Sequence, residues 1–451
     1  MGRLFGTDGA RGVAITELTC ELAMKIGRAA AVVLTRHSKR DKARIIIGKD
    51  TRISSDVLES ALVSGICSVG ADAHILGVIP TPAVAVLVNK YEADAGVMIS
   101  ASHNSVEFNG IKLFSNEGFK LPDSVEYEIE KLILDTPEET ELKDGTEIGR
   151  IVYEKNAAWD YIRHIMKSVD CDFRGIKVAI DCANGASSEC AVHLFQGLGA
   201  SCYFINNDPD GTNINRDCGS THMDHLRKFV VDNKCHVGLA FDGDADRCLA
   251  VDENGDVVDG DKLLAIFSKY MKACGNLKSN TCVVTVMTNL GFMKYAKEEN
   301  IVVSRTGVGD RYVLEEMKRG GYNLGGEQSG HIILLDYANT GDGEMTGVKL
   351  LEIMAKTKKK LSELASVMET YPQVLENVTI KSEYKGNWQT DKGVAEFIEM
   401  YKEKLGDDGR ILVRESGTEP LVRVMLEGKH LGKITEYAKT IAEAIGKSFG
   451  E

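Results

Sequence analysis

The 451-residue sequence contains no uninterrupted apolar run of about 18 residues, the length that a membrane-spanning helix needs. Its N-terminal segment lacks the apolar stretch of a secretory signal peptide and becomes rich in glycine at once. Paired CxxC spacings, which are typical of zinc sites, are missing among the 11 cysteines. We therefore expect a cytoplasmic protein with buried, reduced thiols and no membrane partner.

An excess of positive charge is also absent. The chain has 54 Lys and Arg against 67 Asp and Glu, a formal net charge of −13. Nucleic acids and anionic membranes are bound through basic surfaces, so neither is an expected partner. An anionic ligand would have to meet a locally basic site.

Short apolar runs alternate with helix-length amphipathic segments along the chain, which is the pattern of α/β domains. With 451 residues, the chain exceeds what one hydrophobic core organises, so we expect two to four domains. In the first part, the pattern predicts three strands and two helices: strands over 43–50, 74–79 and 96–100, and helices over 54–69 and 83–90.

A similar unit recurs further along, in which a strand runs into a polar loop. We predict such units within 175–185, 236–242, 281–289 and 322–327. Open α/β sheets bind ligands at the carboxyl ends of their strands, so these loops are candidate sites. Two charged, turn-rich stretches, 135–149 and 369–373, are candidate domain boundaries.

The first candidate loop is Ser-Ala-Ser-His-Asn-Ser, residues 100–105, directly after a predicted buried strand. Small polar residues at that place expose a serine hydroxyl, with His103, Asn104 and Lys112 in reach. A nucleophile or a phosphate carrier requires such an exposed hydroxyl. Taken alone, the same residues are also compatible with an ordinary turn.

The second loop is Asp-Gly-Asp-Ala-Asp-Arg, residues 242–247, after another apolar run. Aspartates this close repel one another unless a cation neutralises them, and their hard oxygen ligands suit Mg²⁺ or Ca²⁺. A solvated acidic turn is the weaker alternative, because predicted strands flank the loop. Glu253 stands twelfth, as in an EF-hand, but Arg247 occupies the place where that loop needs glycine, so we do not expect an EF-hand.

Two further loops carry groups that bind sugars and phosphates. Gly-Gly-Glu-Gln-Ser-Gly-His (325–331) offers a carboxylate, an amide and a hydroxyl, which suit sugar hydroxyls or an amine. Arg-Glu-Ser-Gly-Thr-Glu-Pro (414–420), flanked by strands predicted over 410–413 and 421–427, combines an arginine, hydroxyls and a glycine, and Arg423 follows. These are the components of a phosphate site. Each loop by itself is equally compatible with a surface turn.

Together, the four loops resemble those of the α-D-phosphohexomutase family, and the similarity runs nearly from end to end. Phe-Gly-Thr-Asp-Gly-Ala-Arg-Gly (5–12) completes a set of five motifs in the order of the family. The third loop, followed by Ile-Ile-Leu-Leu-Asp-Tyr and by Thr-Gly-Asp-Gly (340–343), is similar to the bacterial glucosamine-specific members rather than to those acting on glucose or mannose.

The resemblance implies an α/β fold with three similar mixed-sheet domains and a smaller α+β C-terminal domain around a central cleft. Each domain would contribute one loop. Residues 1–150 would carry the phosphoserine loop and 151–250 the metal-binding loop. Residues 251–370 would carry the sugar-binding loop and 371–451 the phosphate-binding loop.

The resemblance also implies the reaction, in which glucosamine 6-phosphate and glucosamine 1-phosphate interconvert through a 1,6-bisphosphate. The product would feed amino-sugar nucleotide and cell-wall precursor synthesis. Ser102, not Ser100, would carry the phosphoryl group, and with Asp242, Asp244 and Asp246 it would hold one Mg²⁺ per chain. Glucosamine or glucose 1,6-bisphosphate would serve as activator.

Phosphoryl transfer needs positioning and charge neutralisation more than covalent help from the protein. We therefore expect Arg11, Lys112 and Arg247 at the reacting phosphate, with Lys112 or His331 as the base and His103 orienting the serine. The expected contacts to the sugar and to the other phosphate come from the third and fourth loops: Glu327, Gln328, Ser329, Arg414, Ser416, Gly417, Thr418 and Arg423.

Two positions depart from the pattern, because Ser105 and Glu415 replace prolines that are common in the family. A haloacid-dehalogenase-type phosphatase is one rival, since Leu-Ala-Phe-Asp-Gly-Asp resembles its opening motif, but that motif would lie near the N-terminus. A catalytically silent phosphosugar-binding protein is another, and the presence of Ser102, Lys112 and the three aspartates argues against it. The sequence leaves the oligomeric state open, and a homodimer is compatible with it.

Overall fold

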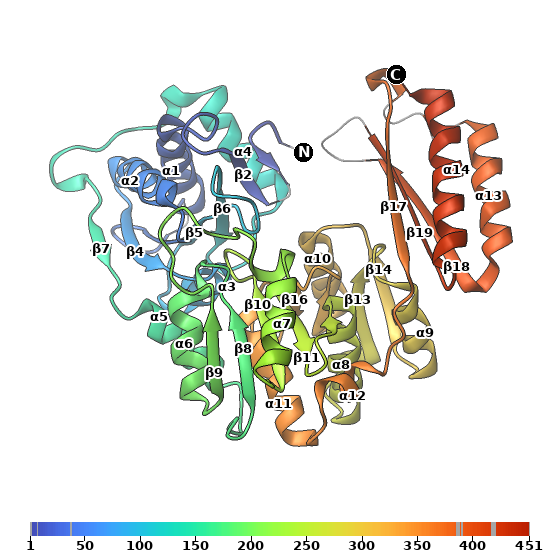
Figure 1. Cartoon of the computed structure of the whole chain (residues 1–451). Coiled ribbons are helices and arrows are strands. Elements are labelled where there is room, and N and C mark those ends of the chain that lie inside the picture. The colour runs from blue at the N-terminus through green and yellow to red at the C-terminus, as the bar shows by residue number, and fades with distance from the viewer. Residues whose placement is uncertain are drawn as a thin grey trace. The chain divides into compact units, whose positions relative to one another are not determined.

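The computed structural model of the chain describes residues 2–6, 8–36, 38–384, 388, 391–415 and 421–450 (Figure 1). They form two compact units, which are considered separately. The first unit comprises the chain up to Met287 together with Ile301–Val367. The second comprises Thr288–Asn300 and the chain from Met368 on. Among the described helices, none is long and apolar enough to cross a membrane.

The first sheet has seven strands, and its order mixes parallel and antiparallel pairs. In spatial order the strands are β1 (Phe5–Gly6), β2 (Gly9–Val13), β6 (Phe108–Ser115), β5 (Ala95–Ile99), β3 (Arg44–Lys49), β4 (Asp72–Val78) and β7 (Ile151–Tyr153). Its helices are α1 (Cys20–Leu34), α2 (Ile53–Ser68), α3 (Thr81–Lys90) and α4 (Asp123–Leu134). The three strands and two helices predicted here are confirmed, with ends that differ by at most two residues.

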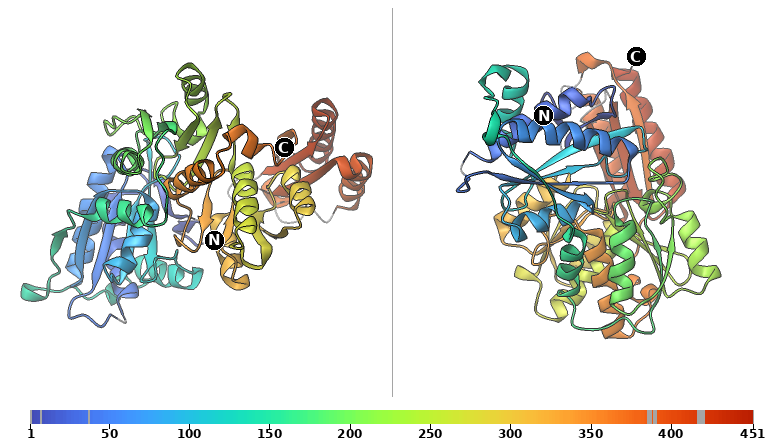
Figure 2. Two further views of the ribbon diagram at one scale, coloured as in Figure 1. Left: turned by 90° about the horizontal axis from the view of Figure 1, so that it is seen from below. Right: turned by 90° about the vertical axis from the view of Figure 1, so that its left-hand side faces the viewer.

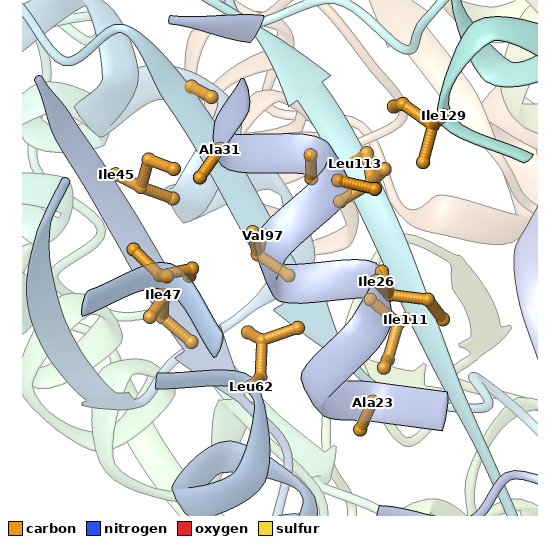
Figure 3. Close-up of a cluster of buried hydrophobic side chains, with 14 of the residues drawn as sticks. Ala23, Ile26, Ala31, Ile45, Ile47, Leu62, Val97, Ile111, Leu113 and Ile129 are labelled. Atoms are coloured by element: carbon orange, nitrogen blue, oxygen red, sulfur yellow. The ribbon is translucent and has the colours of Figure 1, made fainter. Parts of the chain in front are cut away.

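Helices α1, α2 and α4 cover one face of this sheet, and Figure 2 shows the layers from two further directions. Ile26 of α1, Leu62 of α2 and Ile129 of α4 are fully buried in the core drawn in Figure 3. Helix α3 lies on the opposite face, where its Val84 packs over the strand glycines Gly48 and Gly96. This two-sided cover explains why the central strands are apolar runs without alternation.

The second sheet contains the strand that leads into the acidic motif. Its spatial order is β12 (Val257–Val258), β11 (Cys248–Asp252), β10 (Val237–Phe241), β8 (Lys177–Asp181) and β9 (Ser201–Ile205), and its helices are α5 (Ala157–Met166), α6 (Ser187–Gly197) and α7 (Asp224–Asp232). Strand β10 is buried along its whole length and pairs in parallel with β8. The acidic motif therefore begins at the carboxyl end of a central strand.

The third sheet has four strands: β14 (Val302–Thr306), β13 (Thr281–Thr285), β15 (Leu324–Gly326) and β16 (Ile332–Leu334). The same part of the chain forms α8 (Gly260–Ala273), α10 (Asp310–Gly320), α11 (Gly343–Thr357) and α12 (Leu361–Ala365). The predicted strands of the second and third sheets are confirmed, in shorter form, as β8, β10, β13 and β15.

The second unit is a smaller antiparallel sheet with helices. Its strands, in spatial order, are β17 (Gln373–Thr379), β19 (Leu421–Gly428) and β18 (Gly409–Glu415), and its helices are α9 (Leu290–Glu298), α13 (Lys392–Leu405) and α14 (Leu431–Phe449). Helix α9 precedes the rest of this unit by about seventy residues, and its first N–H, from Leu290, donates to Glu427 Oε2 at 3.1 Å.

The α/β class with three mixed sheets and a smaller C-terminal sheet is confirmed. The central cleft and the four domain ranges stay predictions. Strand β7 starts at Ile151, just after the predicted end of the first domain at residue 150, and pairs with β4 of the first sheet. All 11 cysteines are free thiols. Seven of them are buried as expected, whereas Cys274 is exposed and Cys20, Cys171 and Cys202 are half-buried.

Candidate active site

The serine loop follows β5 and holds Ser102 in a left-handed backbone conformation, with φ of 52°. Its N–H donates to Ser100 Oγ at 2.9 Å. Its carbonyl oxygen accepts from Arg52 Nη2 at 3.2 Å and from Asn215 Nδ2 at 2.9 Å. A residue other than glycine keeps this conformation only where its surroundings hold it. The loop therefore presents the Ser102 side chain in one orientation.

Arg52 and Asn215 both hold the serine loop by hydrogen bonds, and the sequence reasoning missed both. Arg52 is buried, pairs with Asp50, and also donates to Asn104 O at 2.6 Å. Arg52 lies just beyond the carboxyl end of β3, so the rule that points to the carboxyl ends of strands could have identified it. Asn215 lies in an irregular segment, and no pattern in the sequence marks it.

The acid loop, residues 242–247, lies directly against the serine loop. Ser102 Oγ donates to Asp242 Oδ2 at 2.6 Å, across 140 positions of sequence. A Cβ at Gly243 would lie 2.5 Å from Ser102 O, so only glycine allows the two loops to come this close. The predicted meeting of the serine with the acidic motif is therefore present in the structure.

The three aspartates of the acid loop fit a divalent cation. One oxygen from each of Asp242, Asp244 and Asp246 lies within 4.8 Å of the others, and all three residues are buried. Asp244 Oδ1 and Asp246 Oδ1 are buried without a hydrogen-bond partner. Burial, together with the charges of Asp246 and Asp244, raises the pKa of Asp242 to about 8. A hard cation such as Mg²⁺ would satisfy the two oxygens and relieve this repulsion.

Two cationic side chains border the acid loop. Lys112 Nζ, in β6, lies 2.8 Å from Asp244 Oδ2 and 3.0 Å from Asp8 Oδ2, and its side chain is 2% exposed. Burial favours the neutral amine, but Asp244 and Asp8 outweigh it and hold the pKa of Lys112 above its ordinary value. Arg247 N–H donates to Asp242 Oδ1 at 3.2 Å, and Arg247 Nε lies 3.8 Å from Asp246 Oδ1.

Arg11 pairs with Asp8, with Nη2 3.0 Å from Asp8 Oδ2, rather than with an aspartate of the acid loop. Burial, and then the nearby charges of Arg247 and Arg11, lower the pKa of His103 to about 4. Its Nδ1 lies 3.2 Å from Ser102 Oγ. His103 is therefore a neutral ring beside the serine near pH 7.

His331 precedes β16 and is buried beside the acid loop. Its Nδ1 lies 3.5 Å from Asp246 Oδ2, and its Nε2 accepts the Gly341 N–H at 3.0 Å. Burial lowers the pKa of His331, but the charges of Asp246 and Asp310 outweigh burial and raise this pKa above its ordinary value. The structure thus brings Ser102, His103, Lys112, Arg247 and His331 to one acidic cluster.

The third loop lies beside the acid loop, and Cys248 N–H donates to Gly330 O at 3.1 Å between them. Glu327 Oε1 accepts the Gly309 N–H at 3.1 Å, and Ser329 Oγ is buried without a hydrogen-bond partner. Gln328 Nε2 makes a long contact of 3.4 Å with Asp259 Oδ2. These three side chains are half-buried, so contacts within the protein do not fully occupy their polar groups.

In the second unit, Arg414 and Arg423 lie opposite each other on β18 and β19. Burial, followed by the charge of Arg423, lowers the pKa of Arg414. Like charges directly opposite on paired strands are destabilising, and an anion between them would relieve this. Ser416, Gly417 and Thr418, which complete the predicted phosphate site, lie outside the described residues.

Family models match almost the whole chain. They are described as phosphoglucomutase/phosphomannomutase domains I, II and III, matching residues 2–140, 159–255 and 259–371, and the C-terminal domain of the same family, matching 375–444. The chain is 54% identical over 445 residues to a phosphoglucosamine mutase of Clostridium novyi, covering 99% of each chain. It is 53% identical over 450 residues to one of Acetivibrio thermocellus, covering 100% of each.

Solved structures share the fold. A phosphoglucomutase/phosphomannomutase family protein from Burkholderia thailandensis superposes with a TM-score of 0.81 at 22% identity, over 99% of this chain and 98% of that one. A protein described as a putative phosphomannomutase from Thermus thermophilus gives a TM-score of 0.79 at 21% identity, over 97% and 98%. The chain therefore belongs to the phosphoglucomutase/phosphomannomutase family of α-D-phosphohexomutases, which are isomerases.

Proposed function

We propose that this chain interconverts glucosamine 6-phosphate and glucosamine 1-phosphate through a phosphoserine at Ser102. The observation that carries the proposal is the 2.6 Å contact of Ser102 Oγ with Asp242, inside a buried group of three aspartates. Its relatives of 53–54% identity over their whole length are named phosphoglucosamine mutases, which supports the choice of sugar. Synthesis of amino-sugar nucleotides and cell-wall precursors would consume the product.

The phosphoserine and its cations carry the chemistry. When the phosphoserine donates, its phosphorus–Oγ bond breaks as a bond from phosphorus to the sugar hydroxyl forms, and the hydroxyl proton passes to His331. Lys112, the other predicted base, is kept protonated by Asp244 and Asp8, so we assign it the role of a cation beside the phosphoryl group. The bisphosphate then turns, and its other phosphoryl group returns to Ser102 Oγ. A Mg²⁺ ion held by the three aspartates and Ser102 would neutralise charge on the phosphoryl oxygens.

The remaining residues orient the reactants. Lys112 and Arg247 supply positive charge beside the serine, Arg11 reaches the same region through Asp8, and neutral His103 orients Ser102 Oγ. We assign the sugar to the third loop, through Glu327, Gln328 and Ser329. The non-reacting phosphate belongs to the fourth loop, and its residues are Arg414, Ser416, Gly417, Thr418 and Arg423.

Three finer points belong to the same proposal. A hexosamine or hexose 1,6-bisphosphate acts as the activator that first phosphorylates Ser102, because the cycle must begin from the phosphorylated enzyme. The enzyme works in the cytoplasm on a small phosphosugar. A homodimer remains compatible with the proposal, which needs residues of one chain only.

Two measurements test the proposal. A coupled assay compares glucosamine 6-phosphate, glucose 6-phosphate and mannose 6-phosphate, and we expect the highest kcat/KM for glucosamine 6-phosphate. A preference for glucose 6-phosphate would contradict the sugar assignment and leave the family intact. Intact-mass analysis after treatment with glucose 1,6-bisphosphate should find one phosphate per chain, absent from Ser102→Ala; phosphate that persists in this variant would place the carrier elsewhere.

A further inference from the structure

Six side chains around the acid loop form a closed ring in which acidic groups alternate with lysine or histidine. In order they are Asp246, Lys112, Asp8, Lys120, Asp310 and His331, and we call them the charge ring. None of the six is more than 27% exposed. Removing buried charges from water is costly, so each of them needs its neighbours.

Lys120 and Asp310 form the side of the ring away from the acid loop. Lys120 Nζ lies 2.5 Å from Asp8 Oδ1 and 2.5 Å from Asp310 Oδ2. Asp8 Oδ2 continues the ring to Lys112 Nζ at 3.0 Å, and Asp310 Oδ2 continues it to His331 Nε2 at 3.5 Å.

The ring closes on one oxygen of the acid loop. Lys112 Nζ lies 3.8 Å, and His331 Nδ1 lies 3.5 Å, from Asp246 Oδ2. Lys112 stands at the end of the ring that faces Ser102, since it also contacts Asp244 at 2.8 Å. Among the described residues, Lys120 makes its ion pairs with Asp8 and Asp310, which link it to Lys112 and His331.

The ring joins three regions of the first unit that are far apart in sequence. Lys120 precedes α4, Asp310 opens α10, and Asp246 follows β10. A single surface ion pair contributes little to stability, and a buried one contributes little more than an apolar pair of the same shape. What the ring supplies is geometry. Each of the two lysines lies between carboxylates, and His331 lies 3.5 Å from both Asp246 and Asp310, with its Nε2 also accepting the Gly341 N–H.

We infer that Lys120 and Asp310 are positioning residues for phosphoryl transfer, which fix Lys112 and His331 at the acid loop. The inference rests on the proposed roles of Lys112 and His331. Without Lys120, Asp8 and Asp310 lose the cation between them. Asp8 is then held by Lys112 and Arg11 alone, so Lys112 loses the fixed partner that sets its distance from Asp244.

The test compares Lys120→Met, Lys120→Arg and Lys278→Met in the full chain. Lys278 is the matched control, because it pairs with Asp336 at 2.6 Å on the exposed surface. We measure kcat and KM for glucosamine 6-phosphate, the melting temperature, and the phosphoserine content by intact mass. Each kcat is divided by the phosphorylated fraction of the chains, and this corrected kcat excludes misfolded chains that carry no phosphoserine.

We expect Lys120→Met to lower this corrected kcat by about 10-fold or more with KM changed by less than about 3-fold, the size of effect found for groups that orient metal ligands. Lys120→Arg should recover most of the loss, and Lys278→Met should behave as wild type. An unchanged corrected kcat in Lys120→Met would overturn the inference. If this variant does not fold, Lys120→Met with Asp310→Asn gives the same readout, because it leaves no unpaired charge between the two positions.

A charge reversal distinguishes an effect that needs the whole charge ring from one that needs only the ion pair between Lys120 and Asp310. Lys120→Glu with Asp310→Lys restores the attraction between these two positions but places an acid against Asp8 and a base against His331. The ring predicts that the reversed pair stays as slow as Lys120→Met, and recovery of wild-type kcat would overturn it. If wild type does not turn over glucosamine 6-phosphate, the proposed sugar is wrong. The ring is then judged by the rate at which glucose 1,6-bisphosphate phosphorylates Ser102 in each variant.

Discussion

The acid loop and the arginine pair, Arg414 with Arg423, both place like charges side by side, but they differ in sign and burial. The three aspartates are buried and already have Lys112 and Arg247 beside them. The two arginines are half-buried and lie on facing strands. A buried acidic group whose oxygens lack hydrogen-bond partners suits a resident cation, whereas a half-buried cationic pair suits an anion that enters and leaves. The predictions below test this difference.

The largest expected effect is on the acid loop. Asp244→Asn removes one of the three carboxylates and one of the acidic partners of Lys112, so kcat should fall by about 10³-fold, the equivalent of several kcal/mol of charge stabilisation. Steady-state kinetics at saturating Mg²⁺ measure it, with Asp256→Asn in an exposed turn as the control. A loss below about 10-fold would mean that Asp244 is not part of a working cation site.

A smaller effect is expected at the arginine pair. Arg414→Ala removes charge-assisted hydrogen bonds to a phosphate, each of which is worth about 1.5–3 kcal/mol, so kcat/KM should fall by roughly 10- to 100-fold. The change should appear mostly in KM, because this pair holds the phosphate that does not react. Lys402→Ala, on an exposed helix, serves as the control. If kcat alone fell, the pair would belong to the reacting phosphate instead.

The two regions should also respond differently to pH. The pKa of Asp242 rises from 3.8 to about 8 in the folded chain. Between these values the folded chain holds a proton that the unfolded chain has released, so metal-free stability falls as pH rises through this window. Mg²⁺ binds the ionised form, and its stabilisation should grow with pH.

Differential scanning calorimetry with EDTA or Mg²⁺ measures this linkage. We expect the increase in melting temperature caused by Mg²⁺ to be about 2 °C or more larger near pH 8 than near pH 5.5. Arg414→Ala should show the same pH dependence, because the arginine pair does not hold the metal. An increase that is equal at both pH values would contradict the raised pKa of Asp242.

The smallest effect is expected at Ser105. Its N–H donates no hydrogen bond to the described residues, so a proline there keeps the backbone hydrogen bonds of the loop and removes only the hydroxyl that bonds the exposed Glu107 carboxylate. Ser105→Pro should leave kcat within about 2-fold of wild type or raise it, and should stabilise the chain by about 0.4–1 kcal/mol through the unfolded state. Urea unfolding and steady-state kinetics measure both. A large loss of kcat would show that the serine loop needs a conformation that proline cannot adopt.

The runs of apolar residues predicted the strands well, because an apolar run in the sequence reflects a buried segment of the chain. The apolar run before Asp242 and the one before Ser100 both became buried strands, and the loops after them carry the reacting groups. The pattern could not find Lys120 or Asp310, because each stands in no motif and has its charged partners in distant segments. Arg52 was missed although the same rule on strand ends applied to it.

The sequence by itself determined the kind of chemistry, through a serine and three aspartates in loops after predicted strands and two arginines on or beside a pair of predicted strands. Only the tertiary structure decided which of these groups meet. Ser102 reaches Asp242 across 140 residues because β5 and β10 deliver their loops to one place and Gly243 leaves room for contact. The charge ring likewise exists only in the folded chain, since periodicity describes which face is buried and not which distant charge lies opposite.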